Sequence, residues 1–255
     1  MFEYACINGL YDGPNPATKM QLPADKSSGD RRAPFTIDEL NKLFRSERYL
    51  TDTFEHPFQF WTPILALFHG MRQNEIAQLY LSDIREAEDG VWVFDLNDNA
   101  DDKSIKTKSS KRLVPIHSFI LDELNFLKYC EILKSNGEQR LFPEISWQRD
   151  GYGKRVSDWF NGDYKKECGV ADVDGRKKDY HSFRNTFTND IHYKQLSKDL
   201  RLRIVGHSIG RDETSKTYVE NFPPKQFYDE IISKVDFEKQ IDLSHLRNSK
   251  YVIKE

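Results

Sequence analysis

Six side chains whose chemistry suits a phosphodiester are spread over four segments of the chain. They are Arg72, Lys106, His181, Arg184, His207 and Tyr218. Two arginines can neutralise a pentacoordinate phosphorane, because each offers a planar fork of charged donors. Tyrosine can act as the nucleophile and lysine can protonate the leaving oxygen, while one histidine accepts the phenol proton and the other donates to a non-bridging oxygen. Such a site needs neither ATP nor Mg²⁺, so we expect no cofactor.

Each of these residues also has an ordinary structural explanation when it is taken alone. Arg72 could form an ion pair at a helix end, and Lys106 could protect a hairpin edge. His181 could cap a helix or lie hydrogen-bonded in the core. Tyr218 is one of 12 tyrosines, and a single tyrosine is more often a core aromatic. A coincidence of all six is far rarer than any one of them, so the set favours a phosphodiester site.

Other kinds of active site find no support in the remaining polar residues. The sequence has no HExxH zinc motif, no GxSxG nucleophile elbow and no GxxxxGK[ST] phosphate loop. Its three cysteines, Cys6, Cys130 and Cys168, are odd in number and far apart. We therefore expect reduced thiols, no disulfide framework and no metal site.

Helix signals surround the first arginine. Thr36 begins a capping-box pattern that predicts a helix over 37–46. A second helix is expected from Pro57 to Gly70, and a short third helix over 73–81. Arg72 should therefore lie at a junction between two helices, with Glu75 one turn further on and able to orient its guanidinium.

The remaining elements complete a mainly helical domain. Segments 91–96 and 111–116 are rich in β-branched and aromatic residues and predict a small antiparallel sheet, whose hairpin carries Lys106 and Lys108. Further helices are expected over 118–137, 153–167, 181–193, 197–205 and 224–234. His181 and Arg184 would share one helix face. The predicted fold class is α+β.

Four motifs follow one another along the chain. They are GMRQNE around Arg72, KTKSSKRLVP in the hairpin, HSFRNTF from His181, and VGHS followed by TY at Tyr218. Each is weak alone, but their order and structural context resemble the catalytic domain of the tyrosine recombinases, also called phage integrases. The resemblance covers residues 72–218, with similar flanks from roughly 34 to 235.

The resemblance implies a role for each residue. Tyr218 would be the nucleophile that holds a 3′ phosphate, Arg72 and Arg184 would clamp that phosphate, and His181 and His207 would assist. Lys106 is our choice for the family's lysine, with Lys108 as the alternative. The implied activity is site-specific DNA recombination, in which strands are cut and rejoined through a phosphotyrosine during DNA integration.

Two other functions stay open beside recombination. One is a truncated integrase, weak or inactive in catalysis, that acts as a DNA-binding remnant. The other is a DNA-relaxing enzyme resembling type IB topoisomerases, which share the chemistry. The implied partners are double-stranded DNA and other protomers on it, as a tetrameric synapse on DNA and a monomer or weak oligomer away from it.

The charge distribution agrees with DNA as a partner even though the net charge is −3. Residues 83–102 hold eight acids against one arginine, whereas 103–112 hold five Lys and Arg and no acid. Residues 176–211 hold nine Lys and Arg against three acids. Phosphate affinity follows local cation density. The predicted DNA-binding residues are Lys103, Lys108, Lys111, Arg112, Arg176, Lys177 and Lys178.

The predicted organisation has four parts. Residues 1–12 would be the tail of a mostly absent N-terminal core-binding domain, 13–34 a linker, and 35–235 the catalytic domain. The tail at 236–255 has helix-like apolar spacing and could dock in trans on a neighbouring protomer. The sequence has neither a membrane-length apolar run nor a signal-peptide pattern, so we expect a cytoplasmic protein, bacterial or phage-encoded and associated with the nucleoid.

Overall fold

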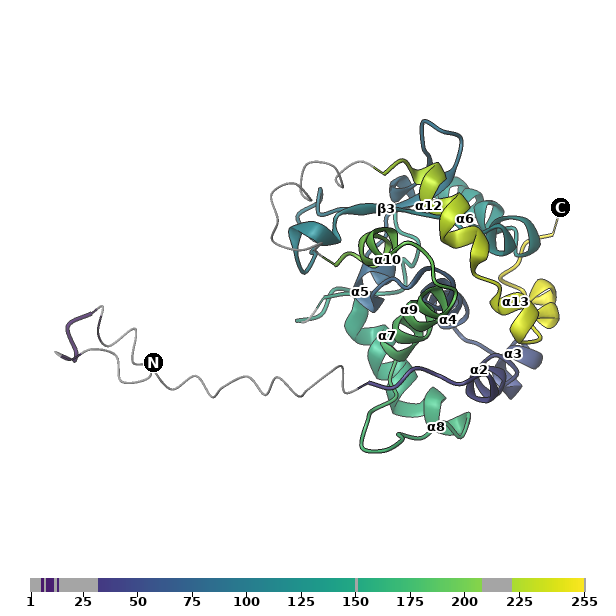
Figure 1. Ribbon diagram of the computed structural model, residues 1–255, viewed down its shortest axis with the longest axis horizontal. Coiled ribbons are helices and arrows are strands. Elements are labelled where there is room, and N and C mark those ends of the chain that lie inside the picture. The colour runs from purple at the N-terminus through teal and green to yellow at the C-terminus, as the bar shows by residue number, and fades with distance from the viewer. Residues whose placement is uncertain are drawn as a thin grey trace. The chain divides into compact units, whose positions relative to one another are not determined.

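The computed structural model describes residues 6, 8–11, 13, 32–149, 151–207 and 222–254. Residues 1–31 and 32–255 form two separate units. The predicted upstream tail at 1–12 and the predicted linker at 13–34 lie for the most part outside the described residues. The described residues of the predicted active site all belong to the second unit (Figure 1).

Two helices that pack on each other form the centre of this unit, α4 (Pro57–His69) and α9 (Ser182–Tyr193). Every residue of α4 after Pro57 is buried, as expected for a helix that is apolar on all sides. The helix ends as predicted at Gly70, whose φ of 62° is left-handed. A Cβ there would lie 2.4 Å from Cδ1 of Phe187, so glycine also permits the close approach of α9. No described helix has the length and apolarity that crossing a membrane requires.

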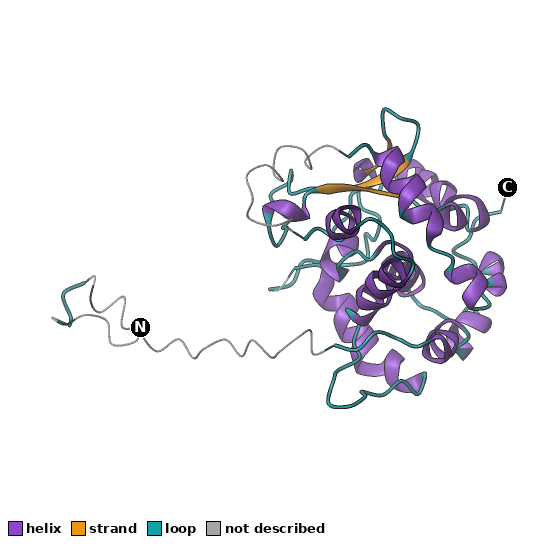
Figure 2. Ribbon diagram, viewed as in Figure 1, coloured by secondary structure: helices purple, strands orange, loops and turns teal. Residues whose placement is uncertain are grey.

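The sheet lies at one edge of the unit (Figure 2) and consists of β1 (Ile84–Glu86), β2 (Trp92–Leu96) and β3 (Arg112–Pro115). Its order is β1-β2-β3 and both pairings are antiparallel, with Phe94 opposite Ile84 on one side and Val114 on the other. These three side chains are buried. The predicted antiparallel sheet is confirmed. β1 was not predicted, because its three residues contain one apolar side chain and show no alternation.

Shorter helices and turns surround this centre. The helices are α2 (Ile37–Phe44), α3 (Glu47–Leu50), α5 (Gln73–Ala77), α6 (Phe126–Ser135), α7 (Gly153–Trp159), α8 (Lys165–Glu167), α10 (Lys198–Ile204), α12 (Pro224–Glu230) and α13 (Phe237–Gln240). Short 3₁₀ or π-helical turns are η2 (Leu81–Asp83), η3 (Lys108–Ser110), η4 (Phe119–Glu123), η5 (Phe160–Tyr164), η6 (Ile232–Lys234) and η7 (Ser244–Asn248). Helices α10 and α12 both pack on β3. The α+β fold class is confirmed.

Three predicted helices are shorter than expected. The helix predicted over 224–234 ends at Glu230 and is followed by η6, and the other two are shortened for tertiary reasons. The segment after α5 leaves the helix because Leu79 O accepts from Leu141 N at 3.0 Å and Leu81 N donates to Gln139 O at 2.8 Å. The helix predicted over 118–137 breaks at Asn125, which has a left-handed φ of 46° and donates from its side chain to a carbonyl of the C-terminal segment. Neither contact has a signal in the local sequence.

The C-terminal segment packs on its own domain. Phe237, Leu243 and Leu246 are buried in the same core as α4, and the ring of Phe237 meets that of Phe68 edge-on at 5.9 Å. Asp52 accepts from the Ser249 hydroxyl at 2.7 Å and from a backbone amide. The boundary predicted at 235 therefore does not divide the core. Docking in trans stays a prediction, and it would require these contacts to be released.

Candidate active site

Arg72 is held by the first turn of α5. It occupies the N-cap position, where its backbone N donates to Oε2 of Glu75 at 2.8 Å, and its Nη1 donates to Oε1 of Glu75 at 2.6 Å. A glutamate at the third helical position commonly caps a helix in this way. The same carboxylate thus ends the helix and orients the guanidinium, as the three-residue spacing predicts. The Arg72 side chain is 20% exposed and can be approached from solvent.

Glu75 also receives a second arginine. Nη1 and Nη2 of Arg112, on β3, donate to its two carboxylate oxygens at 3.1 and 3.0 Å. The Glu75 side chain is only 5% exposed. Burial alone would raise the pKa of this carboxyl group, but the charge and hydrogen bonds of Arg112, followed by those of Arg72, lower the pKa to about 2. Glu75 is therefore ionised throughout the physiological range and joins α5 to the sheet.

Arg184 lies between the ends of two helices. Its Nη1 donates to the carbonyl oxygen of Gly70, at the end of α4, at 2.7 Å, and its Nη2 donates to that of Val205, at the end of α10. Carbonyl groups at a helix C-terminus have no partner within the helix and carry partial negative charge. A buried guanidinium satisfies both at once. Arg184 is 4% exposed, and its position is fixed by three elements.

His207 is placed by the turn that ends α10. The amide of Gly206 donates to Arg203 O at 2.8 Å and the amide of His207 donates to Leu202 O at 2.8 Å, which is the hydrogen-bond pattern of a Schellman motif. Gly206 has a φ of 71°, and a Cβ there would lie 2.8 Å from Nη1 of Arg112. This turn directs the chain out of the helix at His207.

The surroundings of His207 are strongly cationic. Its pKa is lowered first by partial burial and then by the positive charges of Arg184, Arg72, Arg112 and Lys106. These cations come from α9, the start of α5, β3 and the β2–β3 connection, which are far apart in sequence. The charges that act on the pKa of His207 thus include three of the other five residues predicted to act on a phosphodiester, namely Arg72, Lys106 and Arg184.

The segment that carries the two candidate lysines is connected to Arg72 by Ser110. Lys106 and Lys108 both lie at the surface. Ser110 is fully buried, and its hydroxyl lies 3.0 Å from that of Thr107 and accepts from Nη1 of Arg72 at 3.2 Å. Ser110 was missed by the sequence analysis. No local signal points to Ser110, because it lies in η3, outside β3, and its partner Arg72 is 38 residues away in the sequence.

His181 and Tyr218 are the remaining two candidates. His181 occupies the N-cap position of α9, one turn before Arg184, and its backbone N donates to Oδ1 of Asp179 at 2.9 Å. It is half-buried. Tyr218 lies outside the described residues, so its candidacy rests on the sequence motif.

Four of the seven predicted DNA-binding residues are exposed and three are not. Lys108, Lys111, Arg176 and Lys177 lie at the surface, and Lys111 forms an ion pair with Asp98 at 2.5 Å. Side-chain exposure is 2% for Lys103, 7% for Arg112 and 4% for Lys178.

The three buried cations are each held by a carboxylate from a distant part of the chain. Lys103 pairs with Asp83, Arg112 with Glu75, and Lys178 with Glu39. A buried cation that left its partner would strand an uncompensated charge. We therefore leave these three out of the DNA-contacting surface. Local charge density along the chain does not reveal partners that lie 20 to 139 residues away.

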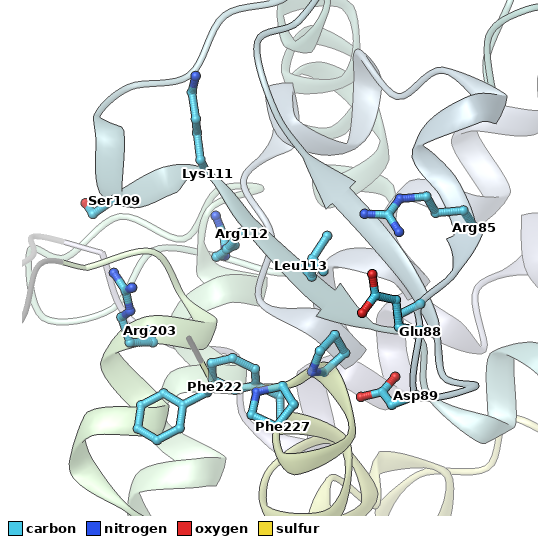
Figure 3. A pocket seen from close by; sticks show the side chains of 13 residues that line it. Arg85, Glu88, Asp89, Ser109, Lys111, Arg112, Leu113, Arg203, Phe222 and Phe227 are labelled. Carbon is cyan, nitrogen blue, oxygen red and sulfur yellow. The ribbon is translucent and has the colours of Figure 1, made fainter. Parts of the chain in front are cut away.

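A hollow of about 620 Å³ lies beside the cluster (Figure 3). Phe222 and Phe227 line it on one side, and Arg112 and Leu113 on the other, with acidic side chains from the β1–β2 turn at its rim. Arg112 lines this hollow, whereas Arg72, Lys106, Arg184 and His207 do not. The hollow therefore adjoins the arginine cluster and shares Arg112 with it.

Comparisons with known proteins bear on the fold. No protein-family model and no curated protein matches the chain. The crystal structure of a lambda integrase dimer bound to a COC′ core site matches with a TM-score of 0.50 and 21% sequence identity, over 86% of this chain and 69% of that one. The crystal structure of XerA recombinase matches with a TM-score of 0.44 and 15% identity, over 82% of this chain and 66% of that one. The chain therefore has the fold of the lambda integrase structure. The resemblance to the tyrosine recombinases, which four sequence motifs indicated, thus extends to the fold.

Proposed function

We propose that this protein breaks and rejoins DNA strands as a site-specific tyrosine recombinase. The observation that carries the proposal is a cluster of arginines at the end of α10: Arg184 donates to Val205 O, and Arg112 donates to Ile204 O and shares Glu75 with Arg72. With Lys106, these charges lower the pKa of His207. A preorganised cluster of cations is suited to a phosphate that gains negative charge in the transition state. The match in fold to lambda integrase supports the same reaction class.

The proposed reaction proceeds in two symmetrical steps. The Tyr218 hydroxyl attacks the phosphorus atom and passes its proton to His181, the bond from phosphorus to the 5′ oxygen breaks, and Lys106 protonates that oxygen. Arg72 and Arg184 donate to the non-bridging oxygens, with His207 beside them. A 5′ hydroxyl from a second duplex then attacks the phosphotyrosine and reverses each transfer. The energy of the phosphodiester is conserved in the tyrosyl ester, so these steps use neither ATP nor a metal ion.

Lys106 is preferred over Lys108 for the protonation step. Both side chains are exposed, and the charge of Lys106 is among those that lower the pKa of His207. Lys106 also lies two residues after Ser104, whose backbone is held by Gln78. A general acid must come within hydrogen-bond reach of the leaving oxygen. The lysine nearer to the arginine cluster is therefore the better candidate.

The proposed partners are duplex DNA and further copies of the chain. The lambda integrase neighbour was crystallised as a dimer on a core site. Strand exchange between two duplexes needs two pairs of protomers, hence a tetrameric synapse. Lys108, Lys111, Arg176 and Lys177 would contact the DNA backbone. A chain that recombines phage or bacterial DNA would work in the cytoplasm, at the nucleoid.

The test is covalent trapping on suicide substrates. Nicked duplexes tiled across the DNA on either side of the coding sequence would be incubated with the protein, and adducts would be resolved by denaturing electrophoresis. We expect a sequence-dependent adduct that Tyr218→Phe abolishes. Tyr193→Phe is the matched control, because Tyr193 is 80% exposed at the end of α9 and should leave the adduct unchanged.

Three outcomes would contradict the proposal. Absence of any adduct would favour a DNA-binding remnant, and an adduct that survives Tyr218→Phe would reject the nucleophile. Relaxation of supercoiled plasmid without sequence preference would instead identify an enzyme resembling type IB topoisomerases.

A further inference from the structure

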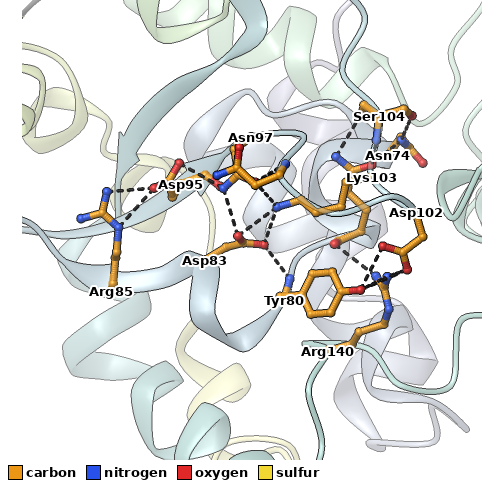
Figure 4. A network of polar contacts seen from close by, with 12 residues as sticks. Asn74, Tyr80, Asp83, Arg85, Asp95, Asn97, Asp102, Lys103, Ser104 and Arg140 are labelled. Carbon is orange, nitrogen blue, oxygen red and sulfur yellow. Dashed lines mark hydrogen bonds and ion pairs between the residues drawn. The ribbon is translucent and has the colours of Figure 1, made fainter.

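The β2–β3 connection that carries Lys106 is anchored to the domain by three consecutive residues, 102–104 (Figure 4). The first is Asp102, which accepts from the Tyr80 hydroxyl at 2.9 Å and from the Tyr152 hydroxyl at 2.7 Å. It also pairs with Arg140, whose guanidinium lies 4.2 and 4.0 Å from the centres of these two rings. Burial opposes ionisation of Asp102, but the hydrogen bonds from Tyr152 and Tyr80 and the Arg140 charge lower its pKa overall.

The second anchor is Lys103, whose side chain turns inward. Its Nζ donates to both carboxylate oxygens of Asp83 at 2.9 Å and to Oδ1 of Asn97 at 2.6 Å. Three donors thus meet three acceptors in a site where the lysine side chain is 2% exposed. A fully satisfied buried ion pair resists opening, because separating it strands a charge.

The third anchor acts on the backbone of Ser104. The side-chain amide of Gln78 accepts from Ser104 N at 3.1 Å and donates to Ser104 O at 3.0 Å, and so imitates a neighbouring strand. Gln78 is 2% exposed and is itself held by Asn74, whose Nδ2 donates to it at 2.9 Å. Both backbone groups of Ser104 are therefore satisfied by one buried side chain.

The connection is anchored again at Ser110, which accepts from Arg72. Only residues 105–109 lie between the two anchors, and Lys106 is the second residue after Ser104. Arg72 and Gln78 lie at the two caps of α5. A rise of 1.5 Å per residue separates them by about 9 Å along the helix. One short helix therefore sets the position of a phosphate-clamping arginine and the start of the lysine segment together.

We propose that Asp102, Lys103 and Gln78 are positioning residues that restrict Lys106 to the neighbourhood of the arginine cluster. This rests on the proposed function, because the lysine is taken to protonate the leaving oxygen. Without these anchors, the free segment would start near the end of β2 and Lys106 would sample a much larger volume. The entropic cost of restricting Lys106 is then incurred once, during folding, and not again in each reaction. The anchors also give a structural role to Lys103, a lysine that does not reach the surface.

The first experiment measures the anchor directly and needs no DNA. Gln78→Met keeps side-chain length but removes both hydrogen bonds to Ser104. Hydrogen–deuterium exchange of residues 97–110 should become about tenfold or more faster, since each bond contributes roughly 1 kcal/mol and 1.4 kcal/mol is a factor of ten. Lys103→Met should act in the same direction, and it replaces Gln78→Met if that variant does not fold. Lys128→Met is the matched control, because Lys128 is exposed in an i, i+3 ion pair on α6. Exchange that stays at the wild-type rate in Gln78→Met and Lys103→Met would overturn the anchor.

The second experiment separates positioning from general damage. The trapped substrate of the proposed function would be prepared with either oxygen or sulphur at the leaving 5′ position. A thiolate leaves without a proton because thiols are far more acidic than alcohols, so the sulphur substrate needs no general acid. We expect the anchor variants to cleave the oxygen substrate about 10- to 100-fold more slowly, and the sulphur substrate within about threefold of wild type.

Two results would refute the positioning role in distinguishable ways. Equal slowing of both substrates would mean that the anchors support the whole site rather than the lysine. If the wild-type chain cleaves neither substrate, the proposed function fails and the positioning role with it, while the exchange measurement still decides whether the anchor exists.

Discussion

The stability of the site can be tested at Glu75, the carboxylate shared by Arg72 and Arg112. Glu75→Gln keeps the shape of the side chain and removes its charge. The pKa of Glu75 falls from 4.5 to about 2 in the folded chain. A difference of about 2.5 pKa units corresponds to about 3 kcal/mol of unfolding free energy at neutral pH, at 1.36 kcal/mol per unit. Breaking a buried ion pair by removing one partner typically costs a similar 3–5 kcal/mol.

The sign of the pH dependence follows from the direction of the shift. A carboxyl group with a lowered folded pKa stabilises the protein above its unfolded value of 4.5, and this contribution declines as the pH falls towards about 2. At pH 3 the charged form should contribute roughly 1 kcal/mol, against about 3 kcal/mol at pH 7. The difference in unfolding free energy between wild type and Glu75→Gln should therefore be about 2 kcal/mol smaller at pH 3 than at pH 7.

Equilibrium unfolding in urea at pH 7 and at the lowest pH where both proteins fold reversibly measures this gap. The control is Glu131→Gln, because the side chain of Glu131 is 64% exposed in its pair with Lys128. Such a surface pair should change the unfolding free energy by less than about 1 kcal/mol. A loss below about 1 kcal/mol for Glu75→Gln at pH 7, or a gap that does not change with pH, would refute the assignment of Glu75 as the charged link between α5 and β3.

Three further predictions concern other parts of the fold. Gly206→Ala should lower the unfolding free energy by about 1–2 kcal/mol, because it places a side chain at a left-handed φ; unchanged thermal unfolding would contradict the turn geometry. Phe237→Ala should cost about 3–5 kcal/mol in denaturant unfolding, because its ring is buried in the shared core; a loss below about 1 kcal/mol would mean that the C-terminal segment is not part of that core. Replacing Arg176 and Lys177 together by alanine should reduce the salt dependence of DNA binding by about 1.8 in the slope of log K against log salt, measured by fluorescence anisotropy; an unchanged slope would remove both from the DNA surface.

The sequence predicted the elements that depend on local signals. The capping box of Thr36 and Glu39 forms as expected, with the Thr36 amide donating to Oε2 of Glu39 at 2.9 Å. Gly70 ends α4 in the left-handed conformation. The spacing of Arg72 and Glu75 also predicted their ion pair. In each case the partners lie within four residues, so the pattern alone determines the contact.

Contacts between distant segments could not be predicted in this way. Lys103 and Lys178 were predicted to bind DNA because they lie in basic segments, but carboxylates distant in the sequence, Asp83 and Glu39, pair with them. The role of Gln78 could not be predicted either, because Gln78 donates to the backbone carbonyl of Ser104 and every residue type has such a carbonyl. The family resemblance indicated the candidate site residues and the local spacing indicated Glu75, whereas the fold was needed to find the distant contacts of Arg112, Ser110 and Gln78.

The packing of the C-terminal segment has a consequence for the order of events during synthesis. Residues near the end of the chain complete the core and contact residues 44–54, about two hundred positions earlier. Contacts of such long sequence separation form late and cannot form before the last segment leaves the ribosome. The α4–α9 centre that holds Arg184 would be incompletely covered until then. A nascent chain that lacks residues 237–254 would therefore carry Arg72, Arg112 and Arg184 without the complete core around them.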